Sequence, residues 1–183
     1  MASLVLVPSL VGAVVGDPDI SFGENGTVVD AASGSEAATG VVLQPDGRIV
    51  VAGRALNADG NYDFLVARYT TTGAPDASFG TNGKTTTGFA PTATDFAYAV
   101  ALYPPSGPDA GKIVVAGVTD SPGRNVIAVA RYTAAGVLDP AFNSTGARAI
   151  DVGAFGDQGL AVALQADGKV VIAGSTSNGT DDD

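Results

Sequence analysis

One stretch of the sequence, VLQPDGRIVVAG, recurs twice in altered form and constrains the fold more than any other feature. It first spans Val42 to Gly53, returns with a longer turn from Ala101 to Gly117, and returns again from Ala163 to Gly174. Two other segments repeat with it: a loop signature that begins GDPDISFGENG at Gly16, and a segment that begins FLVARYTTTG at Phe64. Self-similarity at a fixed period predicts a repeat architecture.

The loop signature sets the repeat boundaries. It starts at Gly16, Gly73 and Gly136, so the starts lie 57 and 63 residues apart, and the longer interval comes mostly from an insertion within Pro104 to Gly111. We therefore expect a single domain over residues 1–183, with repeats at 16–72, 73–135 and 136–183, the last without its final strand.

Residues 1–15 precede the first repeat and leave two interpretations open. The apolar run from Met1 to Gly16 is interrupted by Pro8 and is too short to span a bilayer as a helix, so no membrane insertion is expected. It is either the remnant of a signal peptide or an N-terminal strand, Ser3 to Val7, that supplies the strand missing from the last repeat.

Each repeat is expected to form four short strands. The segments are rich in Val, Ile, Tyr and Thr, and the turn around Pro45, Asp46 and Gly47 has the composition of a tight hairpin. The expected strands are Thr27–Asp30, Ala38–Gln44, Arg48–Arg54 and Phe64–Thr70, then Lys84–Gly88, Tyr98–Tyr103, Lys112–Thr119 and Val126–Thr133, then Arg148–Val152, Leu160–Gln165 and Lys169–Ser175.

Stacked four-stranded units predict an all-β, β-propeller-like array of three antiparallel blades. Propellers close with about four to eight blades. Three blades are therefore half of a six-bladed ring completed by a second chain, or a piece of a longer array.

Charge and composition exclude several functions. The formal net charge is −10, which argues against nucleic acid as a partner. Cysteine and histidine are absent, so thiolate and imidazole metal sites and Ser-His or Cys-His catalytic pairs are excluded. No cofactor is expected, and no catalytic residues stand out among the many Asp side chains.

The three motifs together resemble the delta-60 repeat, a family of tandem units in bacterial exported or surface-associated proteins. The quoted motifs are GAPDASFGTNG, LQPDGRIVVAG and IAVARYTAAG, and the resemblance covers roughly residues 16 to 183. It implies a propeller-like fold and an extracellular or cell-surface location, and it implies no shared catalytic residues. The sequence departs from the pattern at Asn143, which replaces the glycine seen at Gly23 and Gly80.

Asn57, Asp59, Asn61 and Asp63 are a candidate calcium site. Calcium takes several oxygen ligands from one flexible loop, and these residues alternate along LNADGNYDF. The bidentate acid that completes an EF-hand is missing, and the same composition is ordinary for a solvated turn. Both readings stay open at this point.

Two repeated features are interpreted as scaffold. Arg68 is expected to pair with Asp76 of the adjoining loop, as Arg131 is with Asp139. The loop aromatics Phe22, Phe79 and Phe142 are expected to plug the space between units.

The function expected from these observations is that of a non-enzymatic structural or binding module outside the cytoplasm. It would self-associate, most simply as a dimer, and could take a protein or glycan ligand. Two alternatives stay open: a glycan-active or other hydrolytic enzyme using Asp residues at the propeller face, and a polymerising surface or filament subunit.

Overall fold

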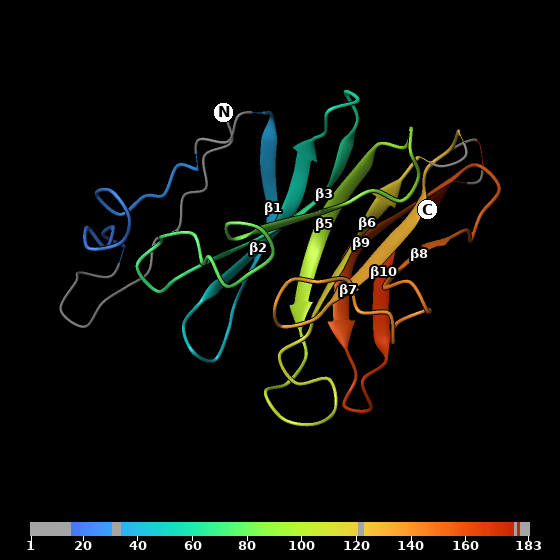
Figure 1. Cartoon of the computed structure of the whole chain (residues 1–183). Coiled ribbons are helices and arrows are strands. Elements are labelled where there is room, and N and C mark those ends of the chain that lie inside the picture. Colours follow the sequence, from blue (N-terminus) through green and yellow to red (C-terminus); the bar gives the residue numbers. More distant parts are fainter. Residues whose placement is uncertain (1–15, 31–33, 121–122, 178, 180–183) are drawn as a thin grey trace.

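The computed structural model describes residues 16–30, 34–120, 123–177 and 179, and these residues form ten strands in three antiparallel sheets (Figure 1). Among them no helix long and apolar enough to cross a membrane is found. The strand expected at Ser3 to Val7 lies outside the described residues.

The sheets follow one another along the chain, and we call them blades 1, 2 and 3. Blade 1 has the order β1 (Glu36–Leu43), β2 (Ile49–Leu56), β3 (Tyr62–Tyr69) and β4 (Lys84–Thr87). Blade 2 has the order β5 (Asp95–Leu102), β6 (Ile113–Thr119), β7 (Val126–Tyr132) and β8 (Ala147–Ile150). Blade 3 consists of β9 (Gly156–Leu164) and β10 (Val170–Ser177).

Each blade is displaced by one strand from the repeats of the sequence. The strand that follows a loop signature turns back onto the strand before it, so β4 pairs with β3 and β8 pairs with β7. The all-β propeller fold is confirmed, but of the three strands expected within residues 136–183 the first pairs with blade 2, so in the described part of the chain the third blade has two strands.

The strand expected at Thr27 to Asp30 does not form. Isolated bridge residues, Glu24, Thr27 and Val28, stand in its place, and Glu24 pairs with Thr27. This segment corresponds to β4 and β8, each of which pairs with the third strand of the preceding blade. Among the described residues no such strand precedes Thr27.

The hairpin between β1 and β2 forms as the residue chemistry predicts. The Gly47 N–H donates to the Gln44 carbonyl at 2.9 Å, and the Asp46 carboxylate accepts from the Arg48 N–H at 3.0 Å. Gly47 has φ of 82°, and its equivalent Gly168 has the same value. Both residues adopt the left-handed conformation that glycine tolerates best.

A bulge recurs where the first and second strands of each blade pair. The register of β1 shifts between Ala38 and Gly40, opposite Gly53. A Cβ on Gly53 would lie 1.8 Å from the Ala37 carbonyl oxygen, and one on Gly117 would lie 2.0 Å from that of Phe96. The backbone of the first strand therefore approaches these glycines too closely for any larger residue.

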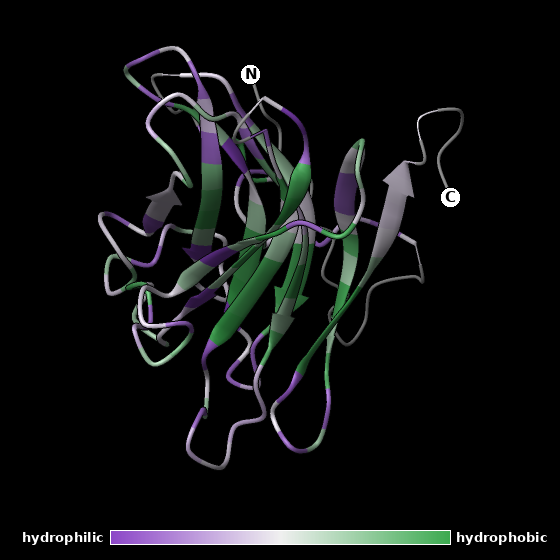
Figure 2. Ribbon diagram, turned by 90° about the vertical axis from the view of Figure 1, so that its right-hand side faces the viewer, coloured by the Kyte–Doolittle hydropathy of each residue, from purple (hydrophilic) through white to green (hydrophobic). Residues whose placement is uncertain are grey.

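The core lies between the blades. One buried cluster joins Val50 and Val66 of blade 1 to Ile113 and Val115 of blade 2, with Phe79 from the connecting loop. A second cluster joins Val114 and Val129 of blade 2 to partly buried apolar residues of blade 3. Figure 2 shows the same distribution, with hydrophobic colouring along the strands and hydrophilic colouring mostly in the loops. The faces that meet a neighbouring blade are therefore the buried ones.

Candidate functional site

We call the contacts of a β-strand arginine with the following loop signature and the next blade a joint. The first joint is formed by Arg68 of β3. Its Nε donates to Asp76 Oδ2 at 2.9 Å, and both side chains are buried. Its Nη2 donates to Ser78 Oγ at 2.9 Å, and its Nη1 donates to the Ala134 carbonyl of blade 2 at 2.6 Å. The expected pair of Arg68 with Asp76 is confirmed, and the same guanidinium also binds the next blade.

The joint of the next repeat keeps the arginine–aspartate pair in a looser geometry, but Ala141 stands where Ser78 bonds to Arg68. Arg131 Nε lies 2.8 Å from Asp139 Oδ2, which confirms the expected ion pair, although the N–H is not aligned on that oxygen. Lys112 also contacts Asp139 at 2.7 Å. The Arg131 guanidinium lies 5.2 Å from the Phe142 ring centroid, a distance at which cations are attracted to aromatic faces.

The loop carboxylates are held ionised by their surroundings. Hydrogen bonds from Ser78, followed by the Arg68 guanidinium, outweigh burial and lower the pKa of Asp76 to about 2. The bond from Lys112 similarly lowers the pKa of Asp139 despite burial. A carboxylate that is ionised and fully engaged in this way is a structural anchor rather than a proton donor.

Two of the three loop phenylalanines lie between blades, as was expected of all three. Phe79 is fully buried in the cluster between blades 1 and 2, and Phe22 is buried against blade 1. Phe142 is only partly buried, between blades 2 and 3. Asn143, which replaces a glycine, has φ of 51° and so keeps the left-handed conformation of its counterpart Gly80, whose φ is 53°.

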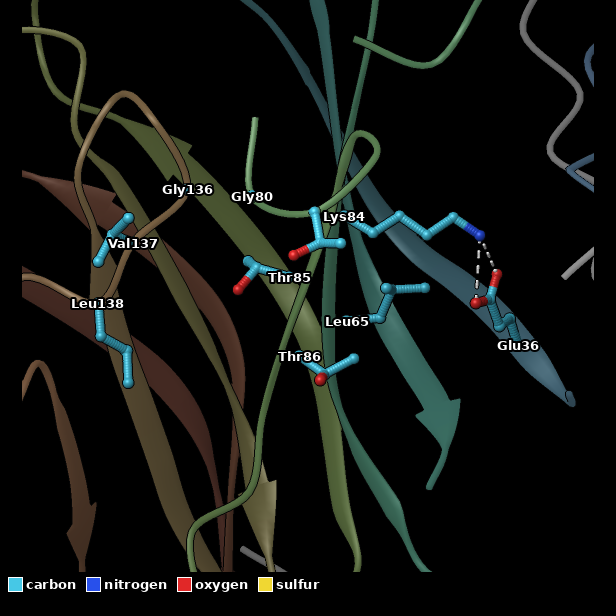
Figure 3. A pocket seen from close by; sticks show the side chains of 10 residues that line it. Glu36, Leu65, Gly80, Lys84, Thr85, Thr86, Gly136, Val137 and Leu138 are labelled. Atoms are coloured by element: carbon cyan, nitrogen blue, oxygen red, sulfur yellow. Dashed lines mark hydrogen bonds and ion pairs between the residues drawn. The ribbon is translucent and has the colours of Figure 1, made fainter. Parts of the chain in front are cut away.

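A groove of about 670 Å³ lies outside β4, between the loop at Gly80 and the turn at Val137 (Figure 3). Lys84 forms one wall, with its Nζ 2.9 and 3.2 Å from the two oxygens of Glu36 and 3.0 Å from Asp30. Burial alone would lower the pKa of Lys84, but these two carboxylates raise it. Among the described residues that line the groove, Glu36 is the single acidic one, and its carboxylate forms the ion pair with Lys84.

The groove recurs with the repeat. A second groove, of about 360 Å³, is lined by residues 23–29 and 72–74, which correspond to residues of the first groove one repeat later. Both grooves follow from the way a loop signature lies against the next blade. They are therefore a property of the architecture, and the Lys84 ion pairs distinguish the first from the second.

The candidate calcium loop is organised around Asn57. Its Oδ1 accepts the N–H groups of Asp59 and Asn61, each at 3.0 Å, and its Nδ2 donates to Asp63 Oδ1 at 3.0 Å. The structure therefore brings Asn57 and Asp63 together, with the Asn57 oxygen directed at the backbone. These bonds are those of a turn, and calcium binding at Asn57, Asp59, Asn61 and Asp63 stays a prediction. Within the described residues no group of three or more acids that could hold a metal is found.

Sequence reasoning missed a pair of buried carboxylates at the start of β5 and β9. Asp95 and Asp157 are 0% and 1% exposed. Asp95 Oδ2 accepts the Phe89 N–H at 2.9 Å, and Asp157 accepts the N–H groups of Val152 and Gly153. Each carboxylate thus holds the loop before its strand. The signal in the sequence was an Asp at one repeat position, in TATDFA and AFGDQG.

These equivalent carboxylates have opposite pKa shifts. Burial raises the pKa of Asp95, which accepts a single backbone N–H and lies near Asp63 and Asp120. Burial acts in the same direction on Asp157, but bonds from Thr176 and from two backbone N–H groups lower its pKa overall. The position is therefore structural in both blades.

The outer faces of the array expose positions that are buried inside it. Val50 of blade 1 and Val114 of blade 2 are both 0% exposed, whereas their equivalent in blade 3, Val171, is 46% exposed. On the opposite face of blade 1, Val41 and Leu43 are 53% and 64% exposed. Their equivalents in blade 2, Val100 and Leu102, pack against the core between blades 1 and 2.

A family model described as "Domain of unknown function (DUF5122) beta-propeller" matches residues 44–79, 111–142 and 165–183. Each match begins at the turn before the second strand of a blade, and the first two include the arginine and loop aspartate of a joint. No curated protein matches the chain significantly. The narrower resemblance to delta-60 repeats stays a prediction. The matches support a propeller-type repeat family of unknown function as the source of the three repeats.

Proposed function

We propose that this protein is a non-enzymatic structural or binding module that self-associates through the outer faces of its blades. The observation that carries the proposal is the exposure of Val171 on blade 3 and of Val41 and Leu43 on blade 1, at positions that are buried between blades elsewhere in the chain. Exposed apolar patches of this kind mark interaction surfaces.

The two outer faces are the two halves of one interface. The face of blade 3 that carries Val171 corresponds to the face of blade 1 that packs on blade 2. The face of blade 1 that carries Val41 corresponds to the face of blade 2 that receives blade 1. Blade 3 of one chain can therefore pack on blade 1 of a second chain through contacts of a type already made inside each chain.

Two chains joined in this way would give six blades, within the range in which propellers close. Each chain would use both of its outer faces, and a two-fold axis would relate the chains. This arrangement is the dimer that we propose. A chain of such rings or an open array would instead correspond to the polymerising alternative.

The charged residues support a scaffold rather than a catalyst. Arg68, Asp76, Arg131 and Asp139 hold the joints, and Asp157 holds a loop. No specific observation favours the hydrolase alternative. The acidic composition is compatible with the extracellular or cell-surface location that we propose for the module.

The test is the mass of the protein in solution at micromolar concentration, measured by light scattering. We expect twice the chain mass of 18.0 kDa. Val171→Asp places a charge on the exposed face of blade 3 and should return the protein to the chain mass. Val152→Asp, a change at an exposed apolar residue in the loop before β9, is the matched control and should leave the dimer intact.

A compact, stable monomer of the unmodified chain would refute the proposal, and would leave further blades of the same polypeptide as the occupants of the outer faces. Filaments in electron micrographs would favour the polymerising alternative. Turnover of a glycan panel that is lost on one Asp substitution would establish an enzyme instead.

A further inference from the structure

The loop signature at residues 16–26 is built like the two that receive an arginine, yet no arginine of the described chain reaches it. We propose that this loop, together with the turn at residues 70–73, is a binding site for an arginine carried on an extended strand of another polypeptide segment. The proposal concerns a different surface chemistry from the apolar contact of the dimer and does not depend on it.

The occupied site around Arg68 shows what is recognised. The strand backbone is held first: the Arg68 N–H donates to the Gly83 carbonyl at 2.8 Å, and the Asp76 N–H donates to the Arg68 carbonyl at 2.9 Å. The guanidinium then bonds to Asp76, Ser78 and the Ala134 carbonyl, and lies 4.8 Å from the centroid of the Phe79 ring. The site therefore binds both the backbone and the side chain of the arginine.

The backbone contacts of Arg131 have the same pattern. Its N–H donates to the Gly146 carbonyl at 2.8 Å, and the Asp139 N–H donates to its carbonyl at 2.9 Å. Because the two joints agree in both backbone bonds, the arrangement is a property of the loop signature rather than of one position.

The loop at residues 16–26 has the same internal hydrogen bonds as the loop that binds Arg68. Asp19 Oδ1 accepts from the Ser21 N–H at 2.9 Å and from the Ser21 hydroxyl at 2.6 Å, and the matching distances from Ser78 to Asp76 are 3.0 and 2.7 Å. The Gly23 N–H donates to the Thr72 carbonyl at 3.0 Å, as Gly80 does to Ala135 at 2.9 Å. The loop therefore keeps the geometry of the occupied copy.

Among the described residues, the groups that would bind the arginine have neither a cationic side chain nor a strand backbone as partner. Asp19 is only 8% exposed, and no ion pair joins it to any of the nine Lys and Arg side chains, all of which lie in the described part of the chain. The Asp19 N–H and the Gly26 carbonyl likewise have no backbone partner in that part. A buried carboxylate without a cation is costly, which favours binding of one.

Arginine fits this site better than lysine. By correspondence with Arg68, the ligand would have to bond at once to the Asp19 carboxylate, the Ser21 hydroxyl and the Thr71 carbonyl, while lying over the Phe22 ring. The planar guanidinium presents several donors in a fixed fork and stacks on aromatic faces, whereas an ammonium group is a single point of charge. The expected ligand is an extended segment of the type Val-Ala-Arg-Tyr.

A second copy of this chain does not offer such a segment in free form. Its Arg68 and Arg131 are the arginines of that sequence type, and both already occupy joints of their own chain. The ligand strand therefore comes from a different polypeptide segment, such as another repeat of the same kind.

The probe is a fluorescent peptide with the sequence of residues 126–133, VIAVARYT, titrated with the 183-residue protein and followed by fluorescence anisotropy. We expect binding that weakens about tenfold or more when the peptide arginine is replaced by glutamine, and similarly when the protein carries Asp19→Asn. A peptide with lysine at that position should bind less tightly than the arginine peptide. Asp17→Asn, at the exposed acid two residues earlier, is the matched control and should change nothing.

Two results would overturn the proposal. One is no binding of the arginine peptide, or binding that is the same to the Asp19→Asn protein, which would place the peptide elsewhere, for example at the edge of β10. The other is an Asp19→Asn protein that loses its dimer while still binding the peptide, which would make the loop a contact between copies. The thermal unfolding midpoint of each variant is measured alongside, so that a loss of folding is not read as a loss of binding.

Discussion

The seam between blades 1 and 2 and the outer face of blade 1 are built from the same residues of the repeat, but only the seam is complete. In the seam, Arg68 of blade 1 bonds to Asp76 in the loop between β3 and β4 and reaches across to the Ala134 carbonyl of blade 2, and Val100 and Leu102 pack in the core. On the outer face, the loop of Asp19 has the same fold, but Val41 and Leu43 are exposed.

The comparison shows what one repeat can and cannot do by itself. A loop signature folds against the blade that follows it, through its turn bonds and through bonds such as that between Gly23 and the Thr72 carbonyl. The apolar face of a blade is buried, and the aspartate of its loop signature receives an arginine, only where another blade precedes it. Stability in such an array is therefore divided between repeats and the interfaces between them.

The largest expected difference between the two regions is at the loop phenylalanine. Phe79→Ala removes a ring that is fully buried between two blades, and should lower the free energy of unfolding by about 3–5 kcal/mol. Phe22→Ala removes the equivalent ring from a face that has one blade behind it, and should cost less. Urea unfolding of both variants measures the difference.

Equal losses for Phe79→Ala and Phe22→Ala would contradict the view that the seam is the more complete of the two. A loss of stability in Phe22→Ala alone would show that the outer face of blade 1 is the better packed of the two regions. Val137→Ala, at an exposed side chain in a turn of blade 2, is the control for truncation without loss of core.

A smaller effect is expected from acid. Hydrogen bonds from Ser78 and the charge of Arg68 lower the pKa of Asp76 to about 2, below the value of about 3.9 expected in the unfolded chain. The folded state therefore gains stability from ionised Asp76 above about pH 4, and loses that gain as the pH falls through about 2. The unfolding free energies of the unmodified protein and of Asp76→Asn, measured by urea from pH 6 to pH 2, should converge at the acid end. A gap that stays constant over this range would show that the seam owes nothing to the charge of Asp76.

Local chemistry predicted much of this fold. The hairpin at Pro45 and Gly47 and the pairing of Arg68 with Asp76 both follow from residues that are close in sequence or that recur with the repeat. Features that recur in every repeat can be recognised from a single sequence, because the copies can be compared with one another.

Grouping of strands into blades was less predictable, because it depends on pairing across a loop. The sequence repeat begins at Gly73, whereas blade 1 continues through β4, and nothing local to Lys84–Thr87 shows that it returns to β3. The burial of Asp95 and Asp157 was missed for a similar reason. An acid next to Gly and Thr residues resembles a solvated turn until the loop folds over it.

The repeats are joined by an arginine of one repeat and an aspartate of the next loop signature, and the same arginine bonds to the Ala134 carbonyl of blade 2. A double-mutant cycle of Arg68→Gln and Asp76→Asn, followed by urea unfolding at neutral pH, measures how much this pair contributes to stability. We expect a coupling energy of about 1.5 kcal/mol or more between the two side chains, because both are buried and each hydrogen-bonds to the other. Additive losses, with a coupling energy near zero, would show that this pair does not hold the repeats together.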